Sequence, residues 1–91
     1  MKITYNNVYK IKLELLLKHN KINCLYCNKF IKDRSDLTID HVLPKSLGGD
    51  DGVNNLALVC KQCNFDKRSL LLTDYLNKFN VQITPKIGKF L

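Results

Sequence analysis

The four cysteines of this chain form two pairs with the same spacing. They are Cys24, Cys27, Cys60 and Cys63. Each Cys-x-x-Cys turn can present two thiolates to a tetrahedral ion, so the two turns together predict a closed structural zinc site with no coordination position open to a substrate. A redox pair or ordinary buried cysteines are the alternatives. If zinc binds, its binding free energy contributes directly to folding.

The segment between the cysteine pairs carries residues suited to hydrolysis of a phosphodiester. That reaction needs an activated water, a cation beside the developing charge and a way to stabilise the departing 3′ oxygen. An unperturbed histidine has a pKa of about 6.5, which suits a general base at neutral pH, and His41 is the only histidine in this segment. Asp40 and Asn64 offer oxygen atoms, which favour Mg²⁺ or Mn²⁺ over a softer ion. Neighbouring residues of a strand project to opposite sides, so Asp40 and His41 could serve the two sides of one in-line displacement.

These residues belong to a longer pattern. It runs through Ile39-Asp40-His41-Val42-Leu43-Pro44-Lys45-Ser46-Leu47-Gly48-Gly49, then Asn54-Asn55-Leu56, then Cys60-x-x-Cys63-Asn64-x-x-Lys67. The pattern resembles the HNH endonucleases, specifically the zinc-stapled subgroup with a ββα-metal core, and it covers about half of the chain. The resemblance implies an α+β fold: a small, treble-clef-like ββα-metal domain with a structural zinc site of four cysteines. It also implies hydrolysis of DNA to 5′-phosphate and 3′-hydroxyl ends.

The resemblance assigns a role to four polar residues of the pattern. His41 would deprotonate the attacking water, and Asp40 and Asn64 would hold the catalytic Mg²⁺ or Mn²⁺. Asn55 would hold the hairpin loop and orient the base through hydrogen bonds. Three of these residues also have a purely structural interpretation: His41 as a partly exposed strand histidine, Asn55 as a turn residue after a glycine-containing loop, and Asn64 as a helix cap.

The elements that would position these residues follow from periodicity. Apolar residues at three- and four-residue spacing predict an amphipathic helix over residues 7–19. Alternating β-branched residues predict a strand over 37–42, and a second strand over 56–59 would deliver Cys60; the two would form a hairpin around a flexible glycine-containing loop.

Beyond Cys63 the sequence predicts helix. The positions Phe65, Leu72, Leu76 and Phe79 fit one helical face, either as one helix or as two broken near Thr73, which could cap the second. Residues 81–91 are predicted to be extended and peripheral.

Length and composition limit the possible architectures. The 91 residues form one domain, predicted as an N-terminal helix (1–22), a zinc and ββα-metal core (23–72) and a C-terminal helix and tail (73–91). A core of this size is marginally stable, which favours an added cross-link. The polar start of the chain and its short apolar runs predict neither a signal peptide nor a membrane span, so we expect a reducing cytoplasm and no membrane partner. Disulfides are rare there.

The charge predicts a polyanionic partner. The chain has 15 Lys and Arg against 8 Asp and Glu, a formal net charge of +7. It stays basic even after four zinc-bound thiolates are counted, and nucleic acid is the common partner of such a domain. We expect double-stranded DNA, with a homodimer or a partner protein supplying specificity, because no long recognition helix is evident. Four basic residues near the proposed site could contact phosphates, although surface lysines are often merely solvated. They are Lys45, Lys61, Lys67 and Arg68.

Two other functions compete with cleavage. The first is a non-catalytic zinc-containing module that only binds DNA, and the second is a zinc domain for protein interaction. A module that only binds DNA has no need to retain Asp40, His41 and Asn64 together, and all three are present. For a protein-interaction domain, the basic excess and the Asp40-His41 pair would be coincidence.

Overall fold

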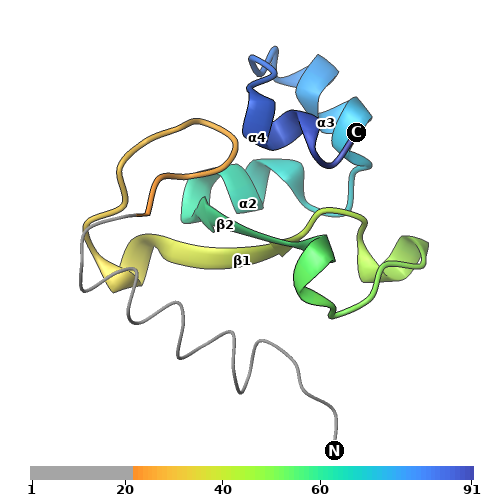
Figure 1. The fold of residues 1–91 in the computed structure, drawn as a ribbon, viewed down its shortest axis with the longest axis horizontal. Helices are drawn as coiled ribbons and strands as arrows, with labels where there is room; N and C mark the ends of the chain where they lie inside the picture. The colour runs from red at the N-terminus through yellow and green to blue at the C-terminus, as the bar shows by residue number, and fades with distance from the viewer. Residues whose placement is uncertain (1–21) are drawn as a thin grey trace, which may run out of the picture.

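The computed structural model describes residues 22–91, so the helix predicted over residues 7–19 lies outside the described part of the chain. The described elements, in chain order, are the 3-10 helix η2 (Arg34–Asp36), strand β1 (Leu37–His41), the 3-10 helices η3 (Lys45–Leu47) and η4 (Val53–Asn55), strand β2 (Leu56–Cys60) and the helices α2 (Lys61–Lys67), α3 (Leu72–Lys78) and α4 (Pro85–Gly88). Figure 1 shows the two strands side by side with α2 next to them, and α3 and α4 beyond α2.

The two strands form the predicted antiparallel hairpin. Leu37 pairs with Cys60 at one end and His41 pairs with Leu56 at the other. Strand β2 is buried along almost its whole length, whereas most of β1 is partly exposed. The connection between the strands is closed where the Val42 N–H donates to the Asn55 carbonyl at 2.9 Å. The hairpin therefore places His41 at one end and delivers Cys60 at the other.

The helical region after Cys63 differs from the prediction of one helical face. It consists of two helices, and the break lies at residues 68–71 rather than near Thr73. Helix α2 ends because Arg68 adopts a positive φ of 49°, which takes the backbone out of the helical region. The N-cap of α3 is Leu71, which makes no side-chain capping bond, so Thr73 is not a cap. The interruption resets the helical phase, which leaves Phe65 63% exposed instead of in the core.

The C-terminal segment is not the extended, peripheral tail that the sequence suggested. Thr84 caps α4 by accepting a hydrogen bond from the Ile87 N–H at 3.3 Å, and Pro85 occupies the first turn, where a missing N–H costs nothing. Ile87 is fully buried. Residues 84–88 thus fold back and contribute a side chain to the core.

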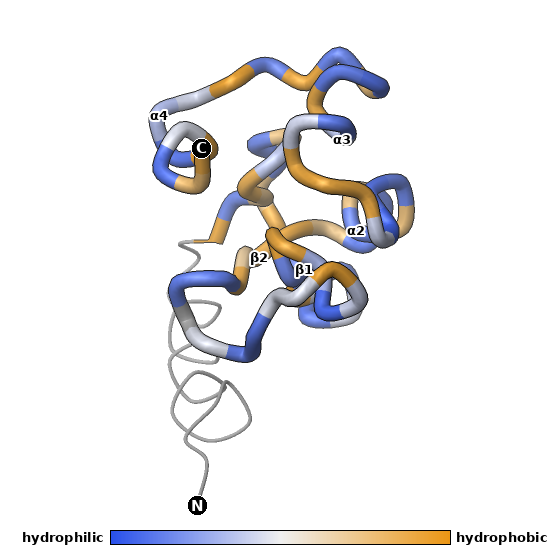
Figure 2. The backbone as a smooth tube through the Cα atoms, turned by 90° about the vertical axis from the view of Figure 1, so that its right-hand side faces the viewer, coloured by the Kyte–Doolittle hydropathy of each residue, from blue (hydrophilic) through white to orange (hydrophobic). Residues whose placement is uncertain are grey.

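The core joins the first cysteine turn to the hairpin and the C-terminal helices. Its buried members are Ile22, Cys24, Tyr26, Ile31, Val42, Ala57, Val59, Cys60, Cys63, Leu72, Tyr75, Leu76 and Ile87. The Tyr26 and Tyr75 rings meet at a centroid distance of 5.0 Å, which packs the cysteine turn directly against α3. Apolar stretches alternate with hydrophilic loops along the backbone (Figure 2). Within residues 22–91, no helix is long and apolar enough to cross a bilayer.

Candidate active site and zinc centre

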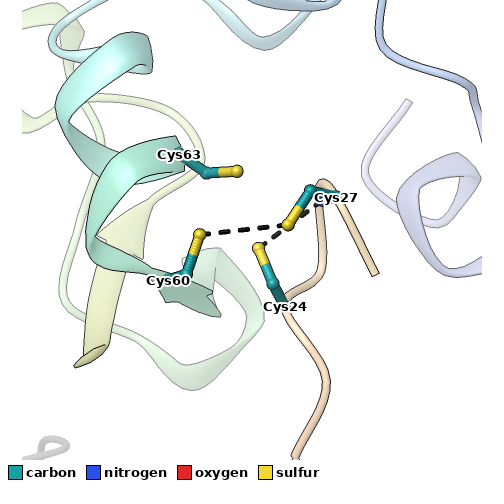
Figure 3. A group of neighbouring side chains, drawn as sticks. All are labelled: Cys24, Cys27, Cys60 and Cys63. Carbon is teal, nitrogen blue, oxygen red and sulfur yellow. Dashed lines mark hydrogen bonds between the residues drawn. The ribbon is translucent and has the colours of Figure 1, made fainter. Parts of the chain in front are cut away.

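The four cysteines converge on one point, as their spacing predicted. Cys24 and Cys27 come from the turn before β1, and Cys60 and Cys63 come from the junction of β2 with α2 (Figure 3). The four sulfurs lie within 4.8 Å of one another, and those of Cys27 and Cys60 are 3.9 Å apart. Thiolates around a tetrahedral Zn²⁺ with bonds of about 2.3 Å lie roughly 3.8 Å apart. All four cysteines are free thiols rather than disulfides, and their geometry fits a zinc ion.

The local electrostatics of this cluster also suit a metal. Burial by itself would raise the pKa of the Cys24 thiol, but backbone N–H groups of Cys27, Cys60 and Tyr26 outweigh burial and lower the pKa. The Cys27 N–H lies 3.5 Å from the Cys24 sulfur. Burial raises the pKa of the Cys63 thiol, a cost that a cation in the cluster would offset because it favours the thiolate. The cluster therefore fits a structural Zn²⁺ held by four thiolates.

A separate pocket of about 280 Å³ lies along the His41 end of β1. Its lining residues are Ile39, Asp40, His41, Pro44, Lys45, Ser46, Asn64, Arg68 and Ser69. Three residues predicted to carry the chemistry, Asp40, His41 and Asn64, thus share one cavity although they come from β1 and α2. The polar lining and the two cationic side chains make the cavity suitable for a phosphate group.

One oxygen of Asp40 is held from inside the protein. The Tyr26 hydroxyl donates to Asp40 Oδ2 at 2.6 Å, and Lys67 Nζ forms an ion pair with the same oxygen at 3.2 Å. Burial and the charge of Asp40 raise the pKa of Tyr26, so its hydroxyl stays protonated and remains a donor. Asp40 Oδ1 makes no hydrogen bond with any residue of the range 22–91. Since no buried polar side-chain atom in the described part of the chain lacks a partner, Oδ1 must be accessible to solvent, and it is free to bind a cation.

Asn64 presents a second free oxygen to the pocket. It is the fourth residue of α2, whose N-cap is Cys60, so the interpretation of Asn64 as a helix cap does not hold. Its amide nitrogen donates to Thr38 Oγ1 at 3.1 Å, which ties α2 to β1 and fixes the side chain. The amide oxygen makes no hydrogen bond with the residues that the structure describes. Asp40 and Asn64 therefore each contribute an uncommitted oxygen, the ligand type that Mg²⁺ and Mn²⁺ prefer.

The imidazole of His41 is held by a carboxylate that sequence reasoning missed. His41 Nε2 lies 2.8 Å from Asp51 Oδ1, and the second oxygen of Asp51 lies 3.2 Å from Lys45 Nζ. Hydrogen bonds from His41 and Lys45 lower the pKa of Asp51, so this carboxyl is ionised at neutral pH. The sequence placed Asp51 in a flexible loop beside glycines, where an aspartate is an ordinary turn residue. Nothing local distinguished it, because its partner lies ten residues away.

Asn55 makes hydrogen bonds across the loop between the strands, but it does not touch the imidazole. Its side chain accepts from the Leu43 N–H at 2.8 Å and donates to the Leu43 and Asp50 carbonyls at 3.0 and 2.9 Å. An asparagine that served only its own turn would not need these bonds to Leu43 and Asp50. Gly49 makes the arrangement possible, because a side chain there would collide with the Leu43 carbonyl and lie 2.9 Å from Asn55 Nδ2.

The four basic residues predicted to contact phosphate occupy different environments. Lys45 and Arg68 line the pocket and are exposed. Lys61 does not line it, because α2 begins at the Cys60 end of the hairpin, opposite His41. Lys67 does not lie on the surface, where it was expected to contact a phosphate. It is fully buried, pairs with Asp40 and donates to the His41 carbonyl at 3.2 Å. Its ammonium thus orients Asp40 instead of reaching solvent.

Comparison with known proteins agrees with this geometry. A family model described as HNH endonuclease matches residues 24–69 of the chain. That range begins at the first zinc-site cysteine, spans the hairpin and α2, and ends at the last residue of the pocket lining. No curated protein matches the chain.

Proposed function

Because the chain belongs to the HNH endonuclease family, we propose that it is a metal-dependent endonuclease that hydrolyses phosphodiester bonds of double-stranded DNA in the pocket beside His41. The observation that carries this proposal is the shared pocket. Within residues 22–91, Asp40 and Asn64 each leave one oxygen without a hydrogen bond, and His41 leaves one ring nitrogen without one. A domain that only binds DNA has no use for this combination of uncommitted groups.

The residues of the pocket divide the work of hydrolysis. His41 removes a proton from water, whose oxygen attacks phosphorus while the bond to the 3′ oxygen breaks. Asp40 and Asn64 would hold Mg²⁺ or Mn²⁺, which when bound supplies positive charge beside the scissile phosphate and the departing oxygen. Lys45 and Arg68 bind the flanking phosphates. The products are a 5′-phosphate and a 3′-hydroxyl, the latter after the departing oxygen takes up a proton from water.

The polar groups around the pocket support this division because they restrict motion. The Asp40 carboxylate is fixed by Tyr26 and Lys67, and the Asn64 amide is fixed by Thr38. Ligands held in place before the substrate arrives need no reorganisation during the reaction. Zinc has a different task, since its four thiolate ligands leave no position for a substrate.

Plasmid cleavage tests the proposal. Zinc-loaded protein is incubated with supercoiled plasmid and Mg²⁺ or Mn²⁺, in parallel with His41→Ala. The parent should give nicked or linear DNA. The variant should give neither while keeping its melting temperature to within a few degrees, because His41 is a partly exposed residue at the end of β1. Equal cleavage by the folded variant would remove His41 from the mechanism. If the parent protein cuts DNA with neither Mg²⁺ nor Mn²⁺ but still binds DNA in a salt-dependent way, the chain is a non-catalytic DNA-binding module instead.

A further inference from the structure

The division of work proposed above gives Asp51 no task, yet Asp51 makes the only hydrogen bond of the His41 ring within residues 22–91. We propose that Asp51 is a positioning residue that fixes His41 in the tautomer with the proton on Nε2, so that Nδ1 is the atom that accepts the proton from water. The proposal rests on the proposed function of His41 as general base and deepens it.

The chemistry of the contact determines the tautomer. A carboxylate can only accept hydrogen bonds, so the 2.8 Å contact with Asp51 Oδ1 requires a proton on His41 Nε2. In the neutral ring the lone pair is then on Nδ1. Nδ1 makes no hydrogen bond, and no buried polar side-chain atom of the described residues lacks one, so Nδ1 is open to solvent. His41 lines the pocket and Asp51 does not. The free nitrogen is thus available to a water there, and the occupied nitrogen is held by the loop.

The loop holds Asp51 from both sides. The carbonyl of Asp50 accepts a hydrogen bond from the Asn55 side chain at 2.9 Å, and the carbonyl of Gly52 accepts one from the Asn55 N–H at 2.9 Å. The Gly52 N–H in turn donates to Asp50 Oδ1 at 3.0 Å. Both neighbours of Asp51 are therefore pinned to one residue. Asn55 orients the base through this loop and through Asp51, not by direct contact with the ring.

Lys45 completes the arrangement on the other oxygen of Asp51. Its ammonium lies 3.2 Å from Oδ2, so the carboxylate bridges a lysine and a histidine. The Asp51 side chain is 21% exposed and that of His41 is 22% exposed, which limits competition from water for their contact. The contact between Lys45 and Asp51 gives the proposal its main rival: Asp51 could serve only to place Lys45 on a phosphate.

Nitrogen NMR tests the tautomer without any cleavage. The chain has two histidines, so His19→Gln leaves His41 as the only imidazole signal. In zinc-loaded, ¹⁵N-labelled protein at a pH where the ring is neutral, the parent should show a protonated Nε2 and an unprotonated Nδ1, with a downfield Nε2 proton protected from exchange. Asp51→Ala should lose that protected proton and move both nitrogens toward tautomer-averaged shifts. Asp51→Asn keeps an acceptor oxygen and should retain part of the signal. A protonated Nδ1 in the parent, or an unchanged spectrum in Asp51→Ala, would overturn the proposal.

Cleavage kinetics separate the rival. Asp51→Ala should lower kcat by about 10- to 100-fold, as loss of a supporting hydrogen bond commonly does, with KM for DNA little changed. In the His41→Ala background, which should not cleave, the readout is the Kd for DNA: Asp51→Ala should leave that Kd unchanged, because Asp51 acts through the ring and not on DNA. Lys45→Ala is the matched control and should raise KM, and it should raise the Kd for DNA in the His41→Ala background. If Asp51→Ala mainly raises KM and also raises the Kd for DNA in the His41→Ala background, Asp51 serves Lys45. If the parent cleaves no DNA at all, the proposed function fails while the NMR result still decides the tautomer.

Discussion

The buried ion pair between Lys67 and Asp40 makes a quantitative prediction about stability. Lys67 is 0% exposed and Asp40 is 5% exposed, so little water can reach either charge if its partner is removed. Breaking such a pair from one side costs about 3–5 kcal/mol. We therefore expect Lys67→Met, which keeps the length of the side chain, to lower the free energy of unfolding by that amount. A domain stable by about 5–15 kcal/mol would remain folded but weakened.

The second partner sharpens this prediction. Asp40→Asn alone leaves the ammonium of Lys67 buried without a counter-charge and should cost a similar amount. In the double variant both charges are gone, and the amide oxygen that Asp40→Asn introduces can still accept from Tyr26. The loss that remains is the hydrogen bond from Lys67 Nζ to the His41 carbonyl, about 1 kcal/mol. The double variant should therefore be more stable than either single variant.

Urea unfolding of the zinc-loaded proteins at one fixed zinc concentration measures all three free energies. Lys61→Met is the matched control, because Lys61 is an exposed lysine at the start of the same helix and its replacement should change stability by no more than about 0.5 kcal/mol. The reasoning fails if Lys67→Met behaves like this control. It also fails if the losses of the two single variants simply add in the double variant, since independent sites add and paired charges do not.

Two further predictions concern the zinc site and the loop. Cys60→Ser should abolish the cooperative thermal transition of the zinc-loaded protein, because structural zinc contributes about 10–16 kcal/mol in comparable sites; an unchanged melting temperature with full zinc content would contradict the assignment. Gly49→Ala should lower the melting temperature and the cleavage rate more than Gly48→Ala does, because a side chain at Gly49 meets the Leu43 carbonyl whereas one at Gly48 meets nothing within 4 Å and only strains a φ of 99°. Equal melting temperatures of the two glycine variants would contradict this prediction, because they would mean that the backbone shifts to relieve the clash at Gly49.

The sequence allowed prediction of those features that depend on residue type and short spacing. The convergence of the four cysteines followed from two Cys-x-x-Cys turns, and the hairpin followed from alternating β-branched residues on either side of a glycine-containing loop. The break after α2 did not follow, because it depends on an arginine with a positive φ, and residue type gives no warning of that. Helix α4 was not predicted, because four residues are too few to show periodicity, although Thr84 and Pro85 are a recognisable start signal for a helix.

The residues of the candidate site were predicted from the sequence, but the contacts that hold their side chains in place were not. The expected group of Asp40, His41 and Asn64 shares a pocket, and the catalytic role of each residue stays a prediction. The supporting residues were hidden, because Asp51 resembles any turn aspartate and Lys67 resembles any surface lysine. Their environments are created by partners distant in sequence: Tyr26 for the Asp40 cluster, and the loop clamped by Asn55 for Asp51. Burial of a lysine is rare enough that no composition argument would favour it.

The position of Tyr26 links the cysteine cluster to the candidate active site. Tyr26 lies between the two cysteines of the first turn, and its hydroxyl donates to Asp40 at 2.6 Å. The hairpin register places Cys60 opposite Leu37 and His41 opposite Leu56, so the metal cluster and the pocket occupy opposite ends of the strands. A two-stranded sheet is hardly stable by itself, and the thiolate cluster secures one end. The His41 end of the hairpin can then carry polar groups that make no hydrogen bond within the protein. Such groups contribute little to stability, so the domain depends on the cysteine end instead.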